Sequence, residues 1–284
     1  ILFWLLIPYC SAASSKEVEK LYEDKIFPIN PMILPVKNQS HVVEVKFKVH
    51  IGAIIDFDEL IQKISVTMWL EVYWHDEQIS WNETDYGGVT KIYPHPDDVW
   101  RPNLAYSNSF SGTRTIGNEF VMLIAESSGK VIWSPSSKME TFCKVDIELY
   151  PFDTQYCEFD FFNWGTVYGE LALSTFDEGM VLDSYTANGE WDLIGFSVRD
   201  YVRSYSNGSI LKPHAAITIS IKRRASVVVL TVLLPVLLLA FLNIFTFVIP
   251  AESGEKLSFG VTILLSLAVF LSYINSMMPQ TSES

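Results

Sequence analysis

Two cysteines lie close together in a chain that has only three. Cys143 and Cys157 enclose thirteen residues in the stretch CKVDIELYPFDTQYC, and the third cysteine is Cys10. In an oxidising compartment such a pair is expected to form a disulfide, whereas cytosolic thiols stay reduced. The first chemistry to consider is therefore oxidative pairing of these two side chains, and it depends on export of the chain.

The first residues favour export. Residues 1–13 form a short apolar run that ends in small residues, as a secretory signal peptide does. Because this run has no initiator Met and no basic segment, we expect the chain to begin inside the leader. Cleavage near Ala13 would remove Cys10 and leave the other two cysteines as a pair. Three N-glycosylation sequons also agree with export; they begin at Asn38, Asn82 and Asn207.

The sequence gives little support for enzyme chemistry or for nucleic-acid binding. It has no nucleophile elbow, no paired-histidine metal motif and no phosphate-binding glycine loop, and its five histidines are scattered. A net charge of −13 argues against a DNA-binding role. The acidity has two interpretations. It can concentrate cations near a cleft, or it can serve only solubility.

Alternating runs between residues 43 and 222 predict strands. Val43–Ile51 places apolar side chains at every second position, which is typical of a half-buried strand. Similar runs occur at Ser65–Trp74, Glu119–Ile124, Lys144–Leu149, Glu158–Phe162, Glu170–Leu173 and Ala216–Lys222. Clusters of Gly, Pro, Asn and Asp separate them, and a short helix is expected around Val18–Tyr22. Residues 14–224 are therefore predicted to form an antiparallel β-sandwich.

Two uncharged runs follow the sandwich. Residues 225–249 are long enough to cross a bilayer, and residues 257–278 form a second such run after a short charged link. So short a link predicts a helical hairpin. Pro235 and Asn243 lie inside the first run, where a kinking or polar residue usually faces protein neighbours rather than lipid.

The second run has a polar stripe. Its members are spaced at alternating intervals of four and three, so they share one helical face; they are Ser258, Thr262, Leu265, Val269, Ser272 and Ser276. One interpretation is that the hydroxyls bond their own backbone or pack on a neighbouring helix. The other is a pore lining, in which hydroxyls wet the ends and an apolar belt at Leu265 and Val269 closes the middle.

Together these features resemble a subunit of the Cys-loop pentameric ligand-gated ion channels, of the nicotinic acetylcholine receptor type. The resemblance covers nearly the whole chain. Its anchors are the cysteine spacing around Tyr150-Pro-Phe-Asp153 and the motif Ser253-Gly-Glu-Lys-Leu-Ser258. It implies an all-β, immunoglobulin-like extracellular sandwich followed by an α-helical transmembrane hairpin.

The resemblance also implies a setting and partners. The chain would lie in the plasma membrane, with its N-terminal domain outside the cell and a postsynaptic site as one location that fits, and it would be no enzyme. Its partners would be a small amine neurotransmitter, with acetylcholine favoured, other subunits in a homo- or heteropentamer, the lipid bilayer and permeating cations. It implies no cofactor, no metal and no nucleic acid.

In this family, aromatic side chains from two subunits box a cationic amine by cation–π attraction. The resemblance assigns Trp164 and Tyr205 to the principal face, with Tyr201 a weaker choice than Tyr205, and Trp69 to the complementary face. Tyr106 is a further candidate for the principal face. For Trp164, the alternative to a ligand-binding role is a position in the core.

The principal face departs from the pattern of an acetylcholine-binding α-type subunit. Asn207-Gly208 stands where such subunits carry adjacent cysteines, and Lys212 takes the place of a tyrosine and would repel a quaternary amine. Tyr106 is displaced by one residue, with Ser107 in the usual tyrosine position, and such a shift in a strand reverses the face to which a ring points. These departures favour a non-α subunit that completes a site on a neighbour, or a different agonist.

The resemblance also assigns roles in the pore. Glu255 would lie at the cytoplasmic mouth, where a ring of carboxylates attracts cations, and Leu265 would be the gate. Ser276 falls where relatives often carry an outer acidic ring, so its neutrality bears on conductance.

Two further assignments concern coupling between the sandwich and the helices. Phe152 would be an apolar finger against the channel domain, and Asp56 or Asp58 would pair with Arg223 to link the two layers. An anchor at the membrane interface is the alternative for Arg223.

Two rival interpretations remain open. A membrane-tethered β-sandwich binding module without a pore would not need the polar stripe. The family has four spanning helices, and the third helix, the cytoplasmic loop and the fourth helix are missing here. We therefore expect a subunit truncated after the second helix, either as a partial sequence or as a short, non-conducting isoform.

Overall fold

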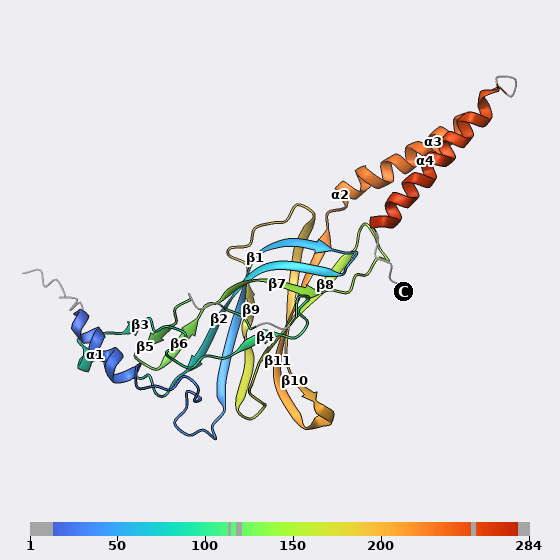
Figure 1. Ribbon diagram of the computed structural model, residues 1–284. Coiled ribbons are helices and arrows are strands. Elements are labelled where there is room, and N and C mark those ends of the chain that lie inside the picture. The colour runs from blue at the N-terminus through green and yellow to red at the C-terminus, as the bar shows by residue number, and fades with distance from the viewer. Residues whose placement is uncertain (1–13, 113–114, 118–120, 251–253, 278–284) are drawn as a thin grey trace, which may run out of the picture.

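The computed structural model describes residues 14–112, 115–117, 121–250 and 254–277 of the chain (Figure 1). A β-rich domain has the short helix α1 (Ser15–Lys25) at one end and a helical hairpin at the other. The helix predicted around Val18–Tyr22 is confirmed as part of α1. Ser14 and Glu17 form a capping box at its start, which satisfies backbone donors that the first turn leaves free.

The strands in the described part form two sheets. The larger sheet has seven strands, in the order β3 (Lys91–Ile92), β5 (Ile124–Glu126), β6 (Lys130–Trp133), β2 (Lys63–His75), β1 (Val43–Asp58) and β9 (Leu171–Val181), with β7 (Ser136–Phe142) also paired to β2. The smaller sheet has four strands, in the order β10 (Trp191–Tyr205), β11 (Ile210–Arg223), β8 (Thr154–Asn163) and β4 (Leu104–Tyr106). Two 3-10 turns, η1 (Glu83–Tyr86) and η2 (Ser206–Gly208), lie between strands.

The alternation in the sequence places the core between the two sheets. Along β1 every second side chain from Val43 to Ile51 is buried, as the period-2 pattern predicts. Phe47 of β1 meets Phe161 of β8 edge to face at 5.3 Å, so the core joins one sheet to the other. The predicted immunoglobulin-like sandwich is confirmed.

The predicted cysteine pair is also confirmed. Cys143, directly after β7, is disulfide-bonded to Cys157 on β8, so the bond joins the larger sheet to the smaller one. In the chain-entropy model a closed loop of this size stabilises the fold by about 3 kcal/mol. Cys10 lies outside the described residues.

Two predicted strands differ from the structure. Lys144–Leu149 alternates but joins no sheet, because the backbone N–H and C=O of Asp146 bond the side chain of Gln155 instead of a neighbouring strand. In Glu119–Ile124, residues 119 and 120 lie outside the described part. Residues 121–123 are not a strand, and β5 begins at Ile124.

The first apolar run folds into a helix with a wide turn. It comprises α2 (Ala225–Val228), the π-helical turn η3 (Val229–Leu233) and α3 (Leu234–Phe245). Pro235 lacks an N–H and its ring clashes with the carbonyl of residue 231, which accounts for a wide turn just before it. The helical part ends at Phe245, before the end of the apolar run.

The second apolar run is a continuous helix, α4 (Glu255–Met277), which lies beside α3 (Figure 1). Within the described residues, α4 is the only helix long and apolar enough to cross a membrane, over Glu255–Ser276, with a mean hydropathy of 2.2. The helix over Val229–Phe245 is apolar but shorter.

Candidate functional site

Trp164 lies on a loop directly after β8 and is accessible from solvent. Its side chain is 53% exposed, so the core position considered as an alternative is wrong. The backbone N–H of Trp164 donates to the carbonyl of Asn103 at 2.8 Å, and the Asn163 amide donates to Thr166 at 2.6 Å. These bonds fix the loop, and a cavity of about 500 Å³ is lined partly by Trp164.

A lysine of the same chain lies over this tryptophan. The hairpin of β10 and β11, called the capping hairpin below, places the Lys212 ammonium 5.3 Å from the centre of the Trp164 ring and 5.5 Å from that of Phe162. This is the position that a ligand cation takes in a cation–π contact. A second positive charge at about 5 Å would be repelled by about 1 to 3 kcal/mol, depending on the local dielectric.

Tyr205 reaches the same region through a buried hydrogen-bonded chain. Its hydroxyl lies 3.0 Å from His214 Nε2, and His214 Nδ1 lies 2.9 Å from a carboxylate oxygen of Asp160. His214 is fully buried, and its ring stacks on Phe162 at 5.3 Å. Phe162 also contacts Trp164, at 5.5 Å, so a chain of ring contacts through Phe162 and His214 connects Trp164 to Tyr205.

Asp160 is the buried acceptor at the base of this chain. Ser107 donates to it at 2.5 Å and Arg203 at 3.3 Å. Burial raises the pKa of Asp160, but the hydrogen bonds from His214 and Ser107 outweigh it and hold that pKa below its usual range. For Tyr201, burial and a hydrogen bond to Asp160 raise the pKa to about 12.

Sequence reasoning missed Asp160 and His214. The histidines are scattered along the chain, and β-pairing, which sequence spacing does not show, is what aligns His214 with Phe162 on β8. A signal was present in the stretch Phe159–Phe162, where a lone carboxylate interrupts an aromatic strand and therefore needs a buried partner.

Tyr106 does not belong to this region. Its side chain on β4 is buried, its hydroxyl accepts a hydrogen bond from the backbone N–H of Glu140 at 3.2 Å, and its ring lies 6.5 Å from that of Phe161. The one-residue displacement turns the ring into the core, while Ser107 points to Asp160. The assignment of Tyr106 to a ligand-binding face is therefore corrected.

Trp69 lies on the other sheet. It is half-buried on β2, and its ring stacks on that of its register partner His50 at 4.8 Å and 11°. Glu71, two residues along the same face, pairs with Lys48 at 3.0 Å. Burial raises the pKa of Glu71, but hydrogen bonds from Tyr73 and Lys48 leave it below its usual range. Trp69, on β2, and Trp164, directly after β8, are therefore carried by different sheets.

Arg223, the last residue of β11, is held in an ion-pair cluster where the sandwich meets the helices. Its Nε and Nη2 donate to the two carboxylate oxygens of Asp153 at 2.7 and 3.1 Å, and its Nη1 donates to Glu59 at 2.6 Å. Burial raises the pKa of Asp153, but the hydrogen bonds from Arg223 and Gln155 bring it below its usual range. The guanidinium also lies 4.3 Å from the centre of the Trp191 ring.

The partners predicted for Arg223 are therefore corrected. Asp56 is an exposed residue of β1, and β1 runs to Asp58 before the turn begins, so the acid that reaches Arg223 is Glu59. Asp153, which belongs to the disulfide-closed loop, is the second partner. Phe152 is 61% exposed in the single chain, so its contact with the channel domain stays a prediction.

The polar stripe of α4 lies on the side of the helix away from α3. All six stripe residues, Ser258, Thr262, Leu265, Val269, Ser272 and Ser276, are exposed. The opposite side is less exposed and includes Ile263, which keeps only 9% of its surface. Glu255 begins the helix and is exposed. A face left open in the single chain is available to further copies.

Some of the stripe hydroxyls donate hydrogen bonds to the backbone of their own helix, which is the first of the two interpretations given above for the stripe. Thr262 donates to the carbonyl of Ser258 at 2.8 Å, and Ser276 donates to that of Tyr273 at 2.7 Å. Each hydroxyl oxygen keeps lone pairs that can accept from water. Backbone bonding and a wet pore lining are therefore compatible.

Asn38, Asn82 and Asn207 are all exposed on turns or loops. Their glycosylation stays a prediction.

Comparison with known proteins adds the following. The family model described as neurotransmitter-gated ion-channel ligand binding domain matches residues 17–225, and the neurotransmitter-gated ion-channel transmembrane region matches residues 232–284. Acetylcholine receptor subunit beta-like 1 of Drosophila melanogaster is 32% identical and aligns with 98% of this chain and 54% of its own. Neuronal acetylcholine receptor subunit alpha-3 of Bos taurus is 29% identical, over 99% of this chain and 56% of its own. The chain spans about half the length of the curated relatives it matches.

Proposed function

The chain belongs to the neurotransmitter-gated ion-channel family, and from that premise we propose that it is a non-α, complementary subunit of a cation-selective pentamer opened by acetylcholine or a similar small amine. The family is one of ligand-gated channels and not of enzymes. The agonist would bind between subunits, and the protein would act in the plasma membrane with its sandwich outside the cell, at a synapse.

One observation supports the proposal that this subunit contributes the complementary face. The Lys212 ammonium lies over Trp164, so the cation position of the principal face is filled from within the chain. Tyr205, a second side chain of that face, is engaged with His214, and Tyr106 is in the core. Trp69, on the other sheet, has one ring face against His50. A neighbour with an intact principal face would therefore complete a box with Trp69.

The described part of α4 supports the pore. An apolar helix with six exposed residues on one face is suited to a ring in which that face lines water. Glu255 in its first turn would form the carboxylate ring that attracts cations, and Leu265 and Val269 would form the belt that closes the pore by dewetting. The Arg223 cluster would transmit movement of the sandwich to the helix that begins at Ala225.

The test is a current recording on the full-length protein. Expressed alone, the subunit should give no acetylcholine current, because its own principal face excludes a quaternary amine. Coexpression with an α-type subunit should give current, and Trp69→Ala should raise the half-maximal acetylcholine concentration by about tenfold or more, as loss of a cation–π contact predicts.

A robust acetylcholine current from the subunit alone would refute the complementary role. A failure to assemble or conduct with every α-type partner would favour the rival interpretation, a tethered binding module or a non-conducting isoform.

A further inference from the structure

Trp69 has unlike neighbours on the two sides of its ring. On the outer face of the larger sheet, its register partners are His50 on β1 and Ser136 on β7. The imidazole of His50 stacks on the indole at 4.8 Å and 11°, whereas Ser136 is exposed and carries only a hydroxymethyl group. One side of the indole is therefore covered by its own chain, and the side toward β7 has room for a ligand.

The stack fixes the orientation of the indole. His50 is itself held in place, because only 13% of its side chain is exposed and Val181 of β9 is its register partner on the side away from Trp69. Contact between two aromatic rings stabilises both of them beyond the burial of area. Since a cation–π contact requires the cation to lie over the ring face, the residue that sets the angle of that face also sets the strength of the contact.

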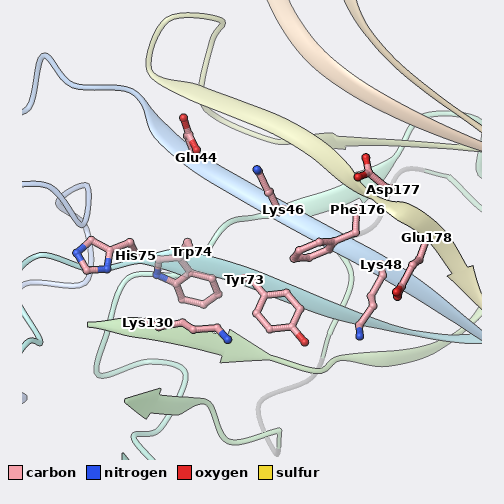
Figure 2. A pocket seen from close by; sticks show the side chains of 10 residues that line it. All are labelled: Glu44, Lys46, Lys48, Tyr73, Trp74, His75, Lys130, Phe176, Asp177 and Glu178. Carbon is pink, nitrogen blue, oxygen red and sulfur yellow. The ribbon is translucent and has the colours of Figure 1, made fainter. Parts of the chain in front are cut away.

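The imidazole also places a titratable nitrogen among charged groups. Nε2 of His50 lies 3.4 Å from a carboxylate oxygen of Glu71 and forms no hydrogen bond among the described residues. When this nitrogen carries a proton, Glu71 is its counterion. Glu71 is shared with Lys48 of β1, at 3.0 Å, and with the hydroxyl of Tyr73 on β2, at 2.7 Å. On β9 the nearby acid Glu178 faces Lys48 (Figure 2).

A proton on His50 changes what Trp69 offers to a cation. An imidazolium behind the indole draws electron density from the ring, and this weakens the attraction of the open face for a cation. A ligand cation over that face would lie about 9 Å from the imidazole, which is the sum of the stacking distance and an ordinary cation–π distance. Two positive charges at this separation also repel each other. Neutral His50 has neither effect.

We propose that His50 is a positioning residue of the complementary face and makes amine binding at Trp69 sensitive to pH. Neutral His50 holds the indole ready for a cation–π contact, and protonated His50 weakens that contact, so acid lowers the affinity for a quaternary amine. Histidine changes charge between about pH 5 and pH 8, and the effect falls in that range. The inference rests on the proposed function, because a neighbouring principal face must bring the cation to Trp69.

The experiment measures acetylcholine binding by the full-length protein assembled with an α-type subunit, at about pH 8 and about pH 5.5. Acetylcholine is a quaternary amine, so its own charge is the same at both pH values. The natural complex should bind it about threefold to tenfold more weakly at the lower pH. His50→Ala should weaken binding about twofold to tenfold at about pH 8, because the indole loses its aromatic partner.

His50→Phe separates positioning from charge. The phenyl ring keeps the stack but takes up no proton, so binding at about pH 8 should stay near that of the natural complex. The weakening at about pH 5.5 should shrink to what other groups cause. His41→Phe is the matched control, since His41 is exposed and lies before β1; it should keep both the affinity and the full pH dependence.

A second measurement needs no partner subunit. The fluorescence of Trp69 is obtained as the difference between the natural chain and Trp69→Phe, each purified in detergent. Because an imidazolium quenches a stacked indole, this fluorescence should fall as the pH is lowered from about 8 to about 5.5, and it should stay constant when His50→Phe is present in both chains.

Three results would overturn the inference. These are a full pH dependence of binding in His50→Phe, binding by His50→Ala that is as tight as in the natural complex while Trp69→Ala binds weakly, and a Trp69 fluorescence that does not change with pH. If Trp69→Ala itself left acetylcholine binding unchanged, the proposed function of this face would fail, and the use of His50 would fail with it.

Discussion

On β11 of the capping hairpin, the Lys212 ammonium lies 5.3 Å from the centre of the Trp164 ring, where an amine ligand would place its own charge. Lys212→Tyr should therefore let the assembled protein bind a quaternary amine at this face. We expect binding to tighten at least about fivefold, since removing the repulsion is worth about 1 kcal/mol or more. Radioligand competition with acetylcholine measures this.

A matched variant separates charge from ring chemistry. Lys212→Gln removes the ammonium without adding an aromatic side chain, so its gain should be smaller than that of Lys212→Tyr. If Lys212→Tyr binds acetylcholine no better than the natural protein does, Lys212 is not what closes this face.

Asp76, directly after β2, is a second residue whose effect can be measured, in this case on the pH dependence of stability. Burial raises its pKa to about 6, although the backbone N–H groups of Gln78 and Ile79 donate to it. Between its ordinary pKa of about 4 and this value, the folded state holds a proton that the unfolded state has released. Stability should therefore fall as the pH rises through this window, by up to about 3 kcal/mol.

Asp76→Asn should remove that part of the pH dependence. Chemical unfolding of the detergent-purified chain, followed by tryptophan fluorescence between about pH 4 and pH 8, tests the expectation. Asp85→Asn, at an exposed position, is the control and should keep the natural slope. If Asp76→Asn kept the same pH slope as the natural protein across the window, Asp76 would not be the group that holds the proton.

Among the elements, α4 allows the clearest functional prediction, because its exposed stripe combines hydroxyl groups at the ends with apolar side chains in the middle. Leu265→Ser in the full-length protein should wet that middle and make the pore easier to open. We expect spontaneous current or a half-maximal agonist concentration lowered about tenfold, which corresponds to about 1.4 kcal/mol.

Leu264→Ser is the matched control for this prediction, because the neighbouring leucine is also exposed but does not belong to the stripe. Its agonist response should stay near that of the natural protein. An unchanged response in Leu265→Ser, or an equal effect in Leu264→Ser, would remove Leu265 from the gate.

How much the sequence predicts also differs between elements. The alternation of apolar and polar residues predicts β1 and the burial of its side chains, because it indicates which face of a sheet each residue occupies. It does not indicate whether a partner strand is available. The prediction therefore fails at Lys144–Leu149, which alternates but joins no sheet. Pairing across strands is equally hidden, which is why the bonds of His214 to Asp160 and Tyr205 appear only in the fold.

For the whole molecule, the decisive contacts lie at the end of the sandwich from which the helical segment begins. Arg223 joins Asp153 of the disulfide-closed loop to Glu59 of the first strand turn, immediately before the helical segment begins at Ala225. The sequence predicts an acid–arginine link here but assigns it to Asp56 or Asp58, because neighbouring acids cannot be ranked by reach without coordinates. A ligand that moves the sandwich would act on the helices through this link.

The central claim is that five copies of α4 surround a water-filled axis with the exposed stripe turned inward. Labelling of engineered thiols in the assembled full-length protein tests it most directly. A charged, water-soluble thiol reagent should modify Thr262→Cys and block the current, while Ile263→Cys, on the side toward α3, should stay unmodified. If Thr262→Cys were inert in open and closed states alike while Ile263→Cys reacted, the stripe would not line a pore.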